Sequence, residues 1–200
     1  QAGTEITLKI KRDEETLTKK VKRDDIKLKN VPYFGIIGDD IAYIKQTGFT
    51  NDAGKEVRDA LEELKKTGKL KGVILDLRGN PGGLLFEAVN VVNCFVDRGQ
   101  LVVNTLGKVK EWDKEYRTLN AGLDLDIPLA VLTNRGSASA SEIVAGTIQD
   151  LDRGVVIGQR SFGKGLVQNT RPLTYNTQMK ITIAKYYTPS GRCIQALDYT

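Results

Sequence analysis

Three serines separated by alanines follow the apolar segment 127–133 and precede a helical pattern. Within them, Ser139 and Glu142 match the S-x-x-E capping box that begins many helices. A cap needs only one hydroxyl. A serine at a strand-to-helix elbow also gains backbone N–H donors and the positive end of a helix, which stabilise developing negative charge. The local pattern leaves two interpretations open, a turn of small residues and a catalytic nucleophile.

A nucleophilic serine needs a base, and the chain contains no histidine. Mechanisms of the Ser-His-Asp, Cys-His and histidine–metal types are therefore excluded. Lys, Asp, Glu and Tyr remain as candidate bases. Lys164 stands out because it lies between Gly163 and Gly165, where the backbone can bend sharply and carry the amine inward. A neutral amine is the working form of such a base, so Lys164 is expected to be held away from water.

Two other motifs overlap the Lys164 loop. Residues 158–164 match the first seven positions of a P-loop, but Gly165 replaces the Ser or Thr that would contact Mg²⁺ and a strand pattern follows. The sequence Ser161-x-x-Lys164 matches the S-x-x-K of penicillin-binding enzymes, but no S-D-N sequence accompanies it. Neither a nucleotide site nor a penicillin-binding site is predicted.

The composition fits one globular domain. The chain has 200 residues, 40% hydrophobic and 28% charged, without an apolar run long enough to span a membrane and without a signal-peptide pattern at its start. The net charge is +5, and residues 1–30 hold nine Lys or Arg against six Asp or Glu. Because these charges alternate with apolar residues, a solvated strand face is favoured over a surface for nucleic acid or anionic lipid.

Cys94 and Cys193 lack metal-site spacing. Two buried thiols are favoured, and a disulfide stays open.

Hydrophobic periodicity predicts elements that would position Ser139 and Lys164. A β-rich opening is followed by two strand–turn–helix units, which predict a layered α/β fold, and by a final group of strands. The predicted strands cover a hairpin over 5–12 and 17–21, then 26–28, 40–46, 73–77, 127–133, 155–157, 166–169 and 179–187, and the predicted helices run from Asn51 or Asp52 to Gly68, over 84–96 and over 140–149.

Four ordered motifs resemble the C-terminal processing, or tail-specific, peptidases. They are D-L-R-G-N-P-G-G at 76–83, S-A-S-A-S-E at 137–142, S-F-G-K-G-L-V-Q at 161–168 and Y-T-P-S-G-R at 187–192. The resemblance covers nearly all of residues 30–195. It implies a crotonase-like α/β core of stacked ββα units.

The resemblance also implies the roles of single residues. The catalytic serine of that family corresponds to Ser139 and its general base to Lys164, while Gln168 would position the lysine. The backbone N–H groups of Gly83 and Ala140 would form the oxyanion hole. The implied activity is a serine endopeptidase that needs no cofactor, binds neither nucleic acid nor nucleotide, and takes protein substrates by their C-terminal tails. An extracytoplasmic site such as the bacterial periplasm is implied as well, and the oligomeric state is left open.

Members of that family carry a PDZ domain before the peptidase core. Residues 3–10 resemble only the last strand of such a domain, so residues 1–12 are expected to be its remnant and residues 13–200 the core, truncated at both ends. The alternative function is a non-catalytic crotonase-like module that binds peptides or small apolar ligands. The presence of both Ser139 and Lys164 favours the enzyme.

Overall fold

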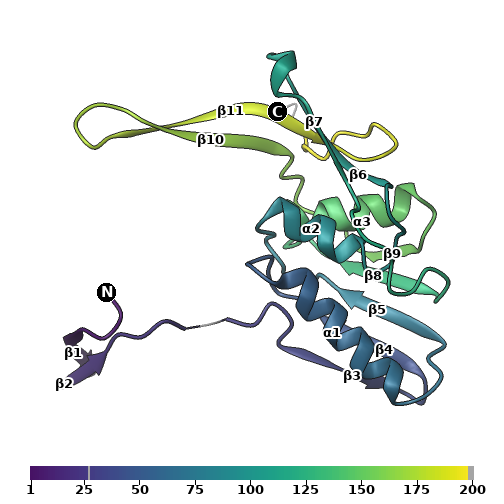
Figure 1. Ribbon diagram of the computed structural model, residues 1–200. Helices are drawn as coiled ribbons and strands as arrows, with labels where there is room; N and C mark the ends of the chain where they lie inside the picture. Colours follow the sequence, from purple (N-terminus) through teal and green to yellow (C-terminus); the bar gives the residue numbers. More distant parts are fainter. Residues whose placement is uncertain (27, 198–200) are drawn as a thin grey trace.

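Two β-sheets and three α-helices form the body of the chain, and a separate two-stranded hairpin precedes it (Figure 1). The computed structural model describes residues 1–26 and 28–197. The mixed arrangement confirms the predicted α/β class. Within this described part, no helix combines the length and the apolar character needed to cross a membrane.

The first sheet has five strands in the order β3-β4-β5-β8-β9. Strands β3 and β4 pair as an antiparallel hairpin, and the other neighbours are parallel, as expected where helices connect successive strands. The strands are β3 (Tyr33–Ile37), β4 (Ile41–Lys45), β5 (Gly72–Asp76), β8 (Leu129–Thr133) and β9 (Val155–Gly158).

The helices α1 (Ala53–Lys66), α2 (Leu85–Val92) and α3 (Ala140–Asp150) pack side by side on one face of this sheet (Figure 1). The apolar side chains of the strands alternate, and the inward set meets the apolar stripes of the helices. The fully buried residues at this interface include Ile44, Leu61, Leu75, Phe95 and Ile143. Packing on this face holds the carboxyl ends of β5 and β8 next to the helix starts that follow them.

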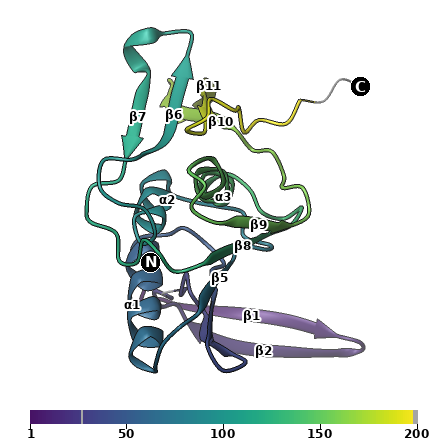
Figure 2. The ribbon, with the colours of Figure 1, turned by 90° about the vertical axis from the view of Figure 1, so that its right-hand side faces the viewer.

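The second sheet is antiparallel, in the order β10-β11-β6-β7. Figures 1 and 2 show α2 and α3 between it and the strands β8 and β9. The buried Thr147 hydroxyl joins the layers by donating to the Val102 carbonyl at 2.8 Å. The hairpin of β10 and β11 projects from the body (Figure 1). The elements are β6 (Leu101–Gly107), the 3₁₀ helix η1 (Lys110–Trp112), β7 (Lys114–Arg117), β10 (Leu166–Pro172) and β11 (Gln178–Tyr187).

The predicted N-terminal hairpin is confirmed, with β1 (Glu5–Arg12) paired antiparallel to β2 (Glu15–Lys22). The strand predicted at 26–28 is wrong. Ile26 is 82% exposed and Leu28 77% exposed, and neither lies in a strand, while residue 27 lies outside the described residues.

The helix predicted over 84–96 ends at Val92, where tight turns replace the helical hydrogen bonds. Strands β3, β6 and β7 had not been predicted.

Candidate active site

The three serines of the 137–142 segment have different environments. Ser137 and Ser141 are fully buried, and their hydroxyls donate to the carbonyls of Leu77 at 2.8 Å and Asn80 at 2.9 Å. Ser139, the N-cap of α3, is half-buried and has φ 56° and ψ −115°. Residues other than glycine rarely adopt this backbone conformation, which costs about 1–3 kcal/mol. Such strain, together with its place between β8 and α3, makes Ser139 resemble a nucleophile elbow.

The turn between β5 and α2 lies directly against this elbow. Gly82 has φ 92°, and a Cβ atom added to it would lie 2.8 Å from both the backbone nitrogen of Ala140 and the Cβ of Ser139. Gly83 has φ 155°, and a Cβ there would lie 2.4 Å from the Phe49 carbonyl oxygen. A side chain at Gly82 would therefore push against the Ser139 elbow, and a side chain at Gly83 would push against Phe49.

The predicted oxyanion-hole donors are the backbone N–H groups of Gly83 and Ala140. Among the hydrogen bonds of the described residues, neither group has a protein acceptor. Both are thus available to an oxygen atom of a ligand, as an oxyanion hole requires. Their catalytic role stays a prediction.

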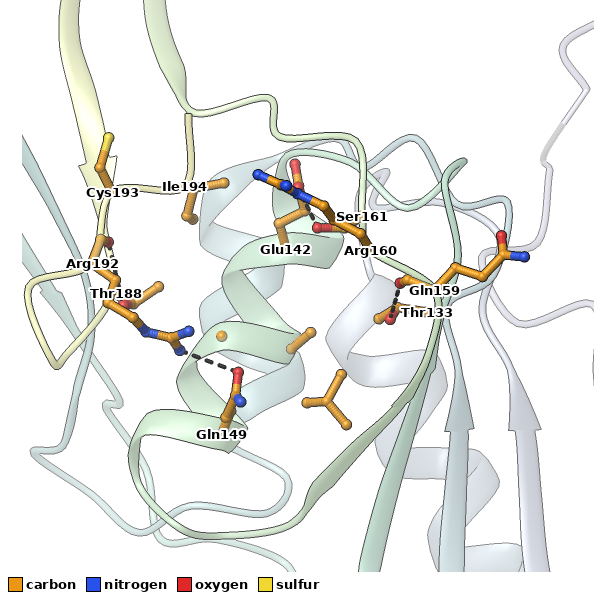
Figure 3. A pocket seen from close by; sticks show the side chains of 13 residues that line it. Thr133, Glu142, Gln149, Gln159, Arg160, Ser161, Thr188, Arg192, Cys193 and Ile194 are labelled. Carbon is orange, nitrogen blue, oxygen red and sulfur yellow. Dashed lines mark hydrogen bonds between the residues drawn. The ribbon is translucent and has the colours of Figure 1, made fainter. Parts of the chain in front are cut away.

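Glu142 joins the Ser139 elbow to the Lys164 loop, although the sequence had indicated only a capping role. It is 6% exposed, and its Oε2 atom accepts the backbone N–H groups of Ser139 and Lys164, each at 2.8 Å. Its Oε1 atom accepts the Ser161 hydroxyl at 2.7 Å and the Gly163 N–H at 2.6 Å (Figure 3). Because one oxygen binds both nitrogens, the backbones of Ser139 and Lys164 are close together.

No hydrogen bond joins the side chains of the predicted dyad among the described residues. Lys164 is exposed, and in the described part of the chain its ammonium group has no hydrogen bond or ion pair, either with Ser139 or with another residue. Gln168 is also exposed and donates to the Thr182 hydroxyl at 3.5 Å rather than contacting Lys164. The expectation that Lys164 is held away from water is therefore not met in this conformation.

Asp76 anchors the start of the glycine turn. Its carboxylate is buried and accepts hydrogen bonds from the Tyr43 hydroxyl at 2.6 Å, Arg78 Nη2 at 2.6 Å and the Arg78 backbone N–H at 2.9 Å, with Lys45 Nζ at 3.2 Å. Burial by itself would raise the pKa of Asp76, but the hydrogen bonds from Arg78, Tyr43 and Lys45 outweigh it and hold the pKa well below its usual value.

Asp76→Asn is expected to destabilise the protein by about 2 kcal/mol at neutral pH, since hydrogen bonds to a buried charge contribute roughly 1.5–3 kcal/mol. A carboxyl whose pKa is lowered by folding stabilises the native state at every pH above its pKa in the unfolded chain, which is about 3.9. This contribution is lost as the pH falls below that value towards the folded pKa. The difference in the free energy of unfolding between wild type and Asp76→Asn should therefore have its full size at pH 5–7 and shrink below about pH 4.

Denaturant titrations at several pH values measure the Asp76→Asn effect. Asp59→Asn is the control, because Asp59 is exposed and its pair with Lys55 is expected to contribute less than about 0.5 kcal/mol. A difference that persists unchanged at pH 2 would contradict the assigned role of the carboxylate.

Glu142→Gln is expected to cost about 2–4 kcal/mol, because the amide NH₂ group would face two of the four donors and leave buried hydrogen bonds unmade at roughly 1–3 kcal/mol each. The loop that carries Lys164 should loosen first. Thermal melting and limited proteolysis of the 158–166 segment measure the two effects. Glu115→Gln, at an exposed glutamate of β7, should change stability by less than about 0.5 kcal/mol. An intact, protease-resistant loop in Glu142→Gln would contradict the tethering role.

A pocket of about 350 Å³ lies behind the Glu142 tether, between α3, the 159–161 segment and the 188–194 segment (Figure 3). Its lining includes Glu142 and Ser161 but neither Ser139 nor Lys164. Asp150 holds the far wall by accepting the Ser190 N–H at 3.0 Å and the Ser190 hydroxyl at 2.7 Å. The T-P-S-G-R motif is thus tied to the end of α3, which the sequence did not indicate.

The two cysteines are both free in the described structure. Cys94 is buried, and its burial raises the pKa of the thiol to about 12. Cys193 is exposed and lines the pocket, so the expectation of two buried thiols is wrong for this residue, which lies in an irregular segment near the surface.

Comparison with known proteins gives a consistent result. The model of peptidase family S41 matches residues 40–199. A carboxy-terminal-processing protease of Bartonella bacilliformis is 43% identical over 204 residues, covering 100% of this chain and 46% of the relative. A Staphylococcus aureus protein named "Probable CtpA-like serine protease" is 41% identical over 196 residues, covering 96% of this chain and 38% of the relative. The chain therefore spans less than half the length of these two relatives.

Among solved structures, the photosystem II D1 C-terminal processing protease superimposes with a TM-score of 0.75 at 30% identity. The match covers 98% of this chain and 54% of that protein.

Proposed function

Because the chain belongs to peptidase family S41, we propose that the protein is a serine endopeptidase in which Ser139 is the nucleophile and Lys164 the general base. The observation that carries the proposal is the Glu142 carboxylate, which binds the backbones of both residues through one oxygen atom. Ser139 and Lys164 lie 25 residues apart in sequence, and they thereby meet beside the N–H groups of Gly83 and Ala140, which have no protein acceptor among the described residues.

In the proposed reaction, the Ser139 hydroxyl oxygen attacks the carbonyl carbon of the substrate and its proton passes to the neutral amine of Lys164. The carbonyl oxygen becomes an oxyanion that accepts hydrogen bonds from the N–H groups of Gly83 and Ala140. Lys164 returns the proton to the leaving amine as the peptide bond breaks. Water then attacks the acyl-enzyme with Lys164 again as base, which releases the carboxyl product and restores Ser139.

This mechanism requires the Lys164 side chain to turn from solvent towards Ser139, since a solvated ammonium is a poor base. Glu142 already holds the Lys164 backbone in place, so the proposed movement is that of the side chain. Gln168 lies at the β-bulge of β10 and would support the amine after such a movement.

Several finer features belong to the same proposal. The core is crotonase-like, residues 1–12 are the end of a PDZ domain, and residues 13–200 are the peptidase core. The substrates are proteins recognised by their C-terminal tails, with no cofactor, nucleotide or nucleic acid involved. The site of action is extracytoplasmic. The names of the Bartonella bacilliformis relative and of the D1 processing protease support tail processing as the activity, and the name of the Staphylococcus aureus relative supports a serine protease.

The test is an assay of the complete protein against an unfolded protein substrate, with the products identified by mass spectrometry. Wild type should cleave and Ser139→Ala should not, and replacing the last residues of the substrate should change the rate. The exposed Lys164 amine favours one alternative, a non-catalytic module that binds peptides or small apolar ligands. Binding of the substrate without Ser139-dependent cleavage would establish that alternative and overturn the peptidase.

A further inference from the structure

Asn80 is a fully buried polar residue in the turn between β5 and α2. Its side chain bridges two backbone groups. Nδ2 donates to the carbonyl of Gln46 at 3.1 Å, and Oδ1 accepts the N–H of Gly82 at 2.9 Å. The first bond holds the turn to the end of β4, and the second directs the Gly82 N–H inward. The next N–H along the chain, that of Gly83, has no protein acceptor in the described structure.

The backbone of Asn80 reaches the serine elbow. Its carbonyl oxygen accepts the N–H of Ala138 at 3.0 Å and the Ser141 hydroxyl at 2.9 Å. Ala138 and Ser141 flank Ser139 and Ala140 on either side. The same residue therefore fixes the turn that presents one predicted oxyanion-hole donor and the segment that presents the other.

The geometry points to Asn80 as the positioning residue that sets the spacing of the Gly83 and Ala140 N–H donors. This inference rests on the proposed peptidase function. Asn80 acts through Gly82 on one side and through Ala138 and Ser141 on the other. An asparagine suits this place because its amide carries a donor for the Gln46 carbonyl and an acceptor for the Gly82 N–H at the same time.

Two variants separate these contacts. Asn80→Ala removes both side-chain hydrogen bonds. Asn80→Asp keeps an acceptor for Gly82, but it can donate to the Gln46 carbonyl only while its carboxyl is protonated. Asn93→Ala is the matched control, because Asn93 is also buried and bridges backbone groups, from Val96 to Asn120, away from the active site.

The measurements are kcat and KM per folded protein, together with the affinity for a peptide aldehyde. The hydroxyl of Ser139 adds across the aldehyde C=O bond to form a hemiacetal whose oxygen occupies the oxyanion hole. Asn80→Ala should lower kcat by about 10- to 100-fold with KM nearly unchanged, somewhat less than the roughly 10²- to 10³-fold loss for deleting one donor. Aldehyde affinity should fall by the same factor as kcat/KM.

Asn80→Asp should approach wild-type kcat at the acidic end of the assay range and fall away from it as the pH rises, because the carboxylate cannot donate to Gln46 and repels an oxyanion. Comparison with wild type at each pH cancels the ionisation of the general base. If Asn80→Ala does not fold, the pH dependence of Asn80→Asp still tests the positioning role. Asn93→Ala should melt at a lower temperature and keep wild-type kcat.

The outcomes distinguish this inference from the proposed function. Absence of Ser139-dependent cleavage in the wild type would overturn both. With the wild type active, an Asn80→Ala kcat and aldehyde affinity within about threefold of wild type would overturn the positioning role alone. A loss confined to KM, or an equal loss in Asn93→Ala, would do so too.

Discussion

Ser139→Ala is expected to lower cleavage by the complete protein at least about a thousandfold, because removal of a covalent nucleophile leaves only binding and the oxyanion hole. Its melting temperature should change little, since Ser139 is half-buried and its Glu142 contact is made by the backbone N–H. Initial rates and thermal melts measured on the same preparations give both quantities.

The neighbouring serines supply the controls. Ser137→Ala and Ser141→Ala should keep much more activity but melt lower, because each removes one buried hydrogen bond with a net contribution of roughly 0.5–1.5 kcal/mol. Ser139→Gly should be as inactive as Ser139→Ala yet melt higher, since glycine relieves the strain at φ 56°. An acyl adduct trapped on Ser137 or Ser141 would contradict the assignment, as would full activity in Ser139→Ala.

Replacement of Lys164 should have an effect of similar size. Lys164→Met removes the amine, and Lys164→Arg keeps the positive charge as a guanidinium that does not deprotonate in proteins. Both variants should therefore be inactive at every pH, because neither side chain can accept the proton of the Ser139 hydroxyl. Rates measured across pH 6–10 separate a base from a charge that merely binds substrate.

The stability of the Lys164 variants tests the exposed conformation. A buried lysine replaced by Met would raise the melting temperature near neutral pH, but an exposed one should leave stability within about 0.5 kcal/mol. Lys180→Met, at an exposed lysine of β11, is the control for both activity and melting. Cleavage that persists in Lys164→Met would require a different base for Ser139. A clear rise in melting temperature for Lys164→Met alone would show that the amine is buried in solution.

The positions of helices and strands with a strong hydrophobic periodicity could be predicted from the sequence. Helix α1 and strands β4, β5 and β8 lie where the apolar pattern indicated, because each buries apolar side chains in the core. Strand β11 also lies where it was predicted, although most of its residues are exposed. The predicted strand at 26–28 failed since two apolar residues at alternate positions do not make a strand without a partner. Strands β6 and β7 were missed, and they are held by pairing with each other and with the distant β11.

The sequence alone determined which chemistry is possible. Without histidine, a serine nucleophile needs another base, and the resemblance of four ordered motifs to the C-terminal processing peptidases assigned these roles to Ser139 and Lys164. Only the tertiary structure decided how those residues are held. It buries Ser137 and Ser141 through bonds to residues about sixty positions away, strains Ser139, makes Glu142 a tether between two loops and leaves the Lys164 amine in solvent. Periodicity reports which face of an element is apolar, whereas hydrogen bonds between distant segments depend on how the elements pack.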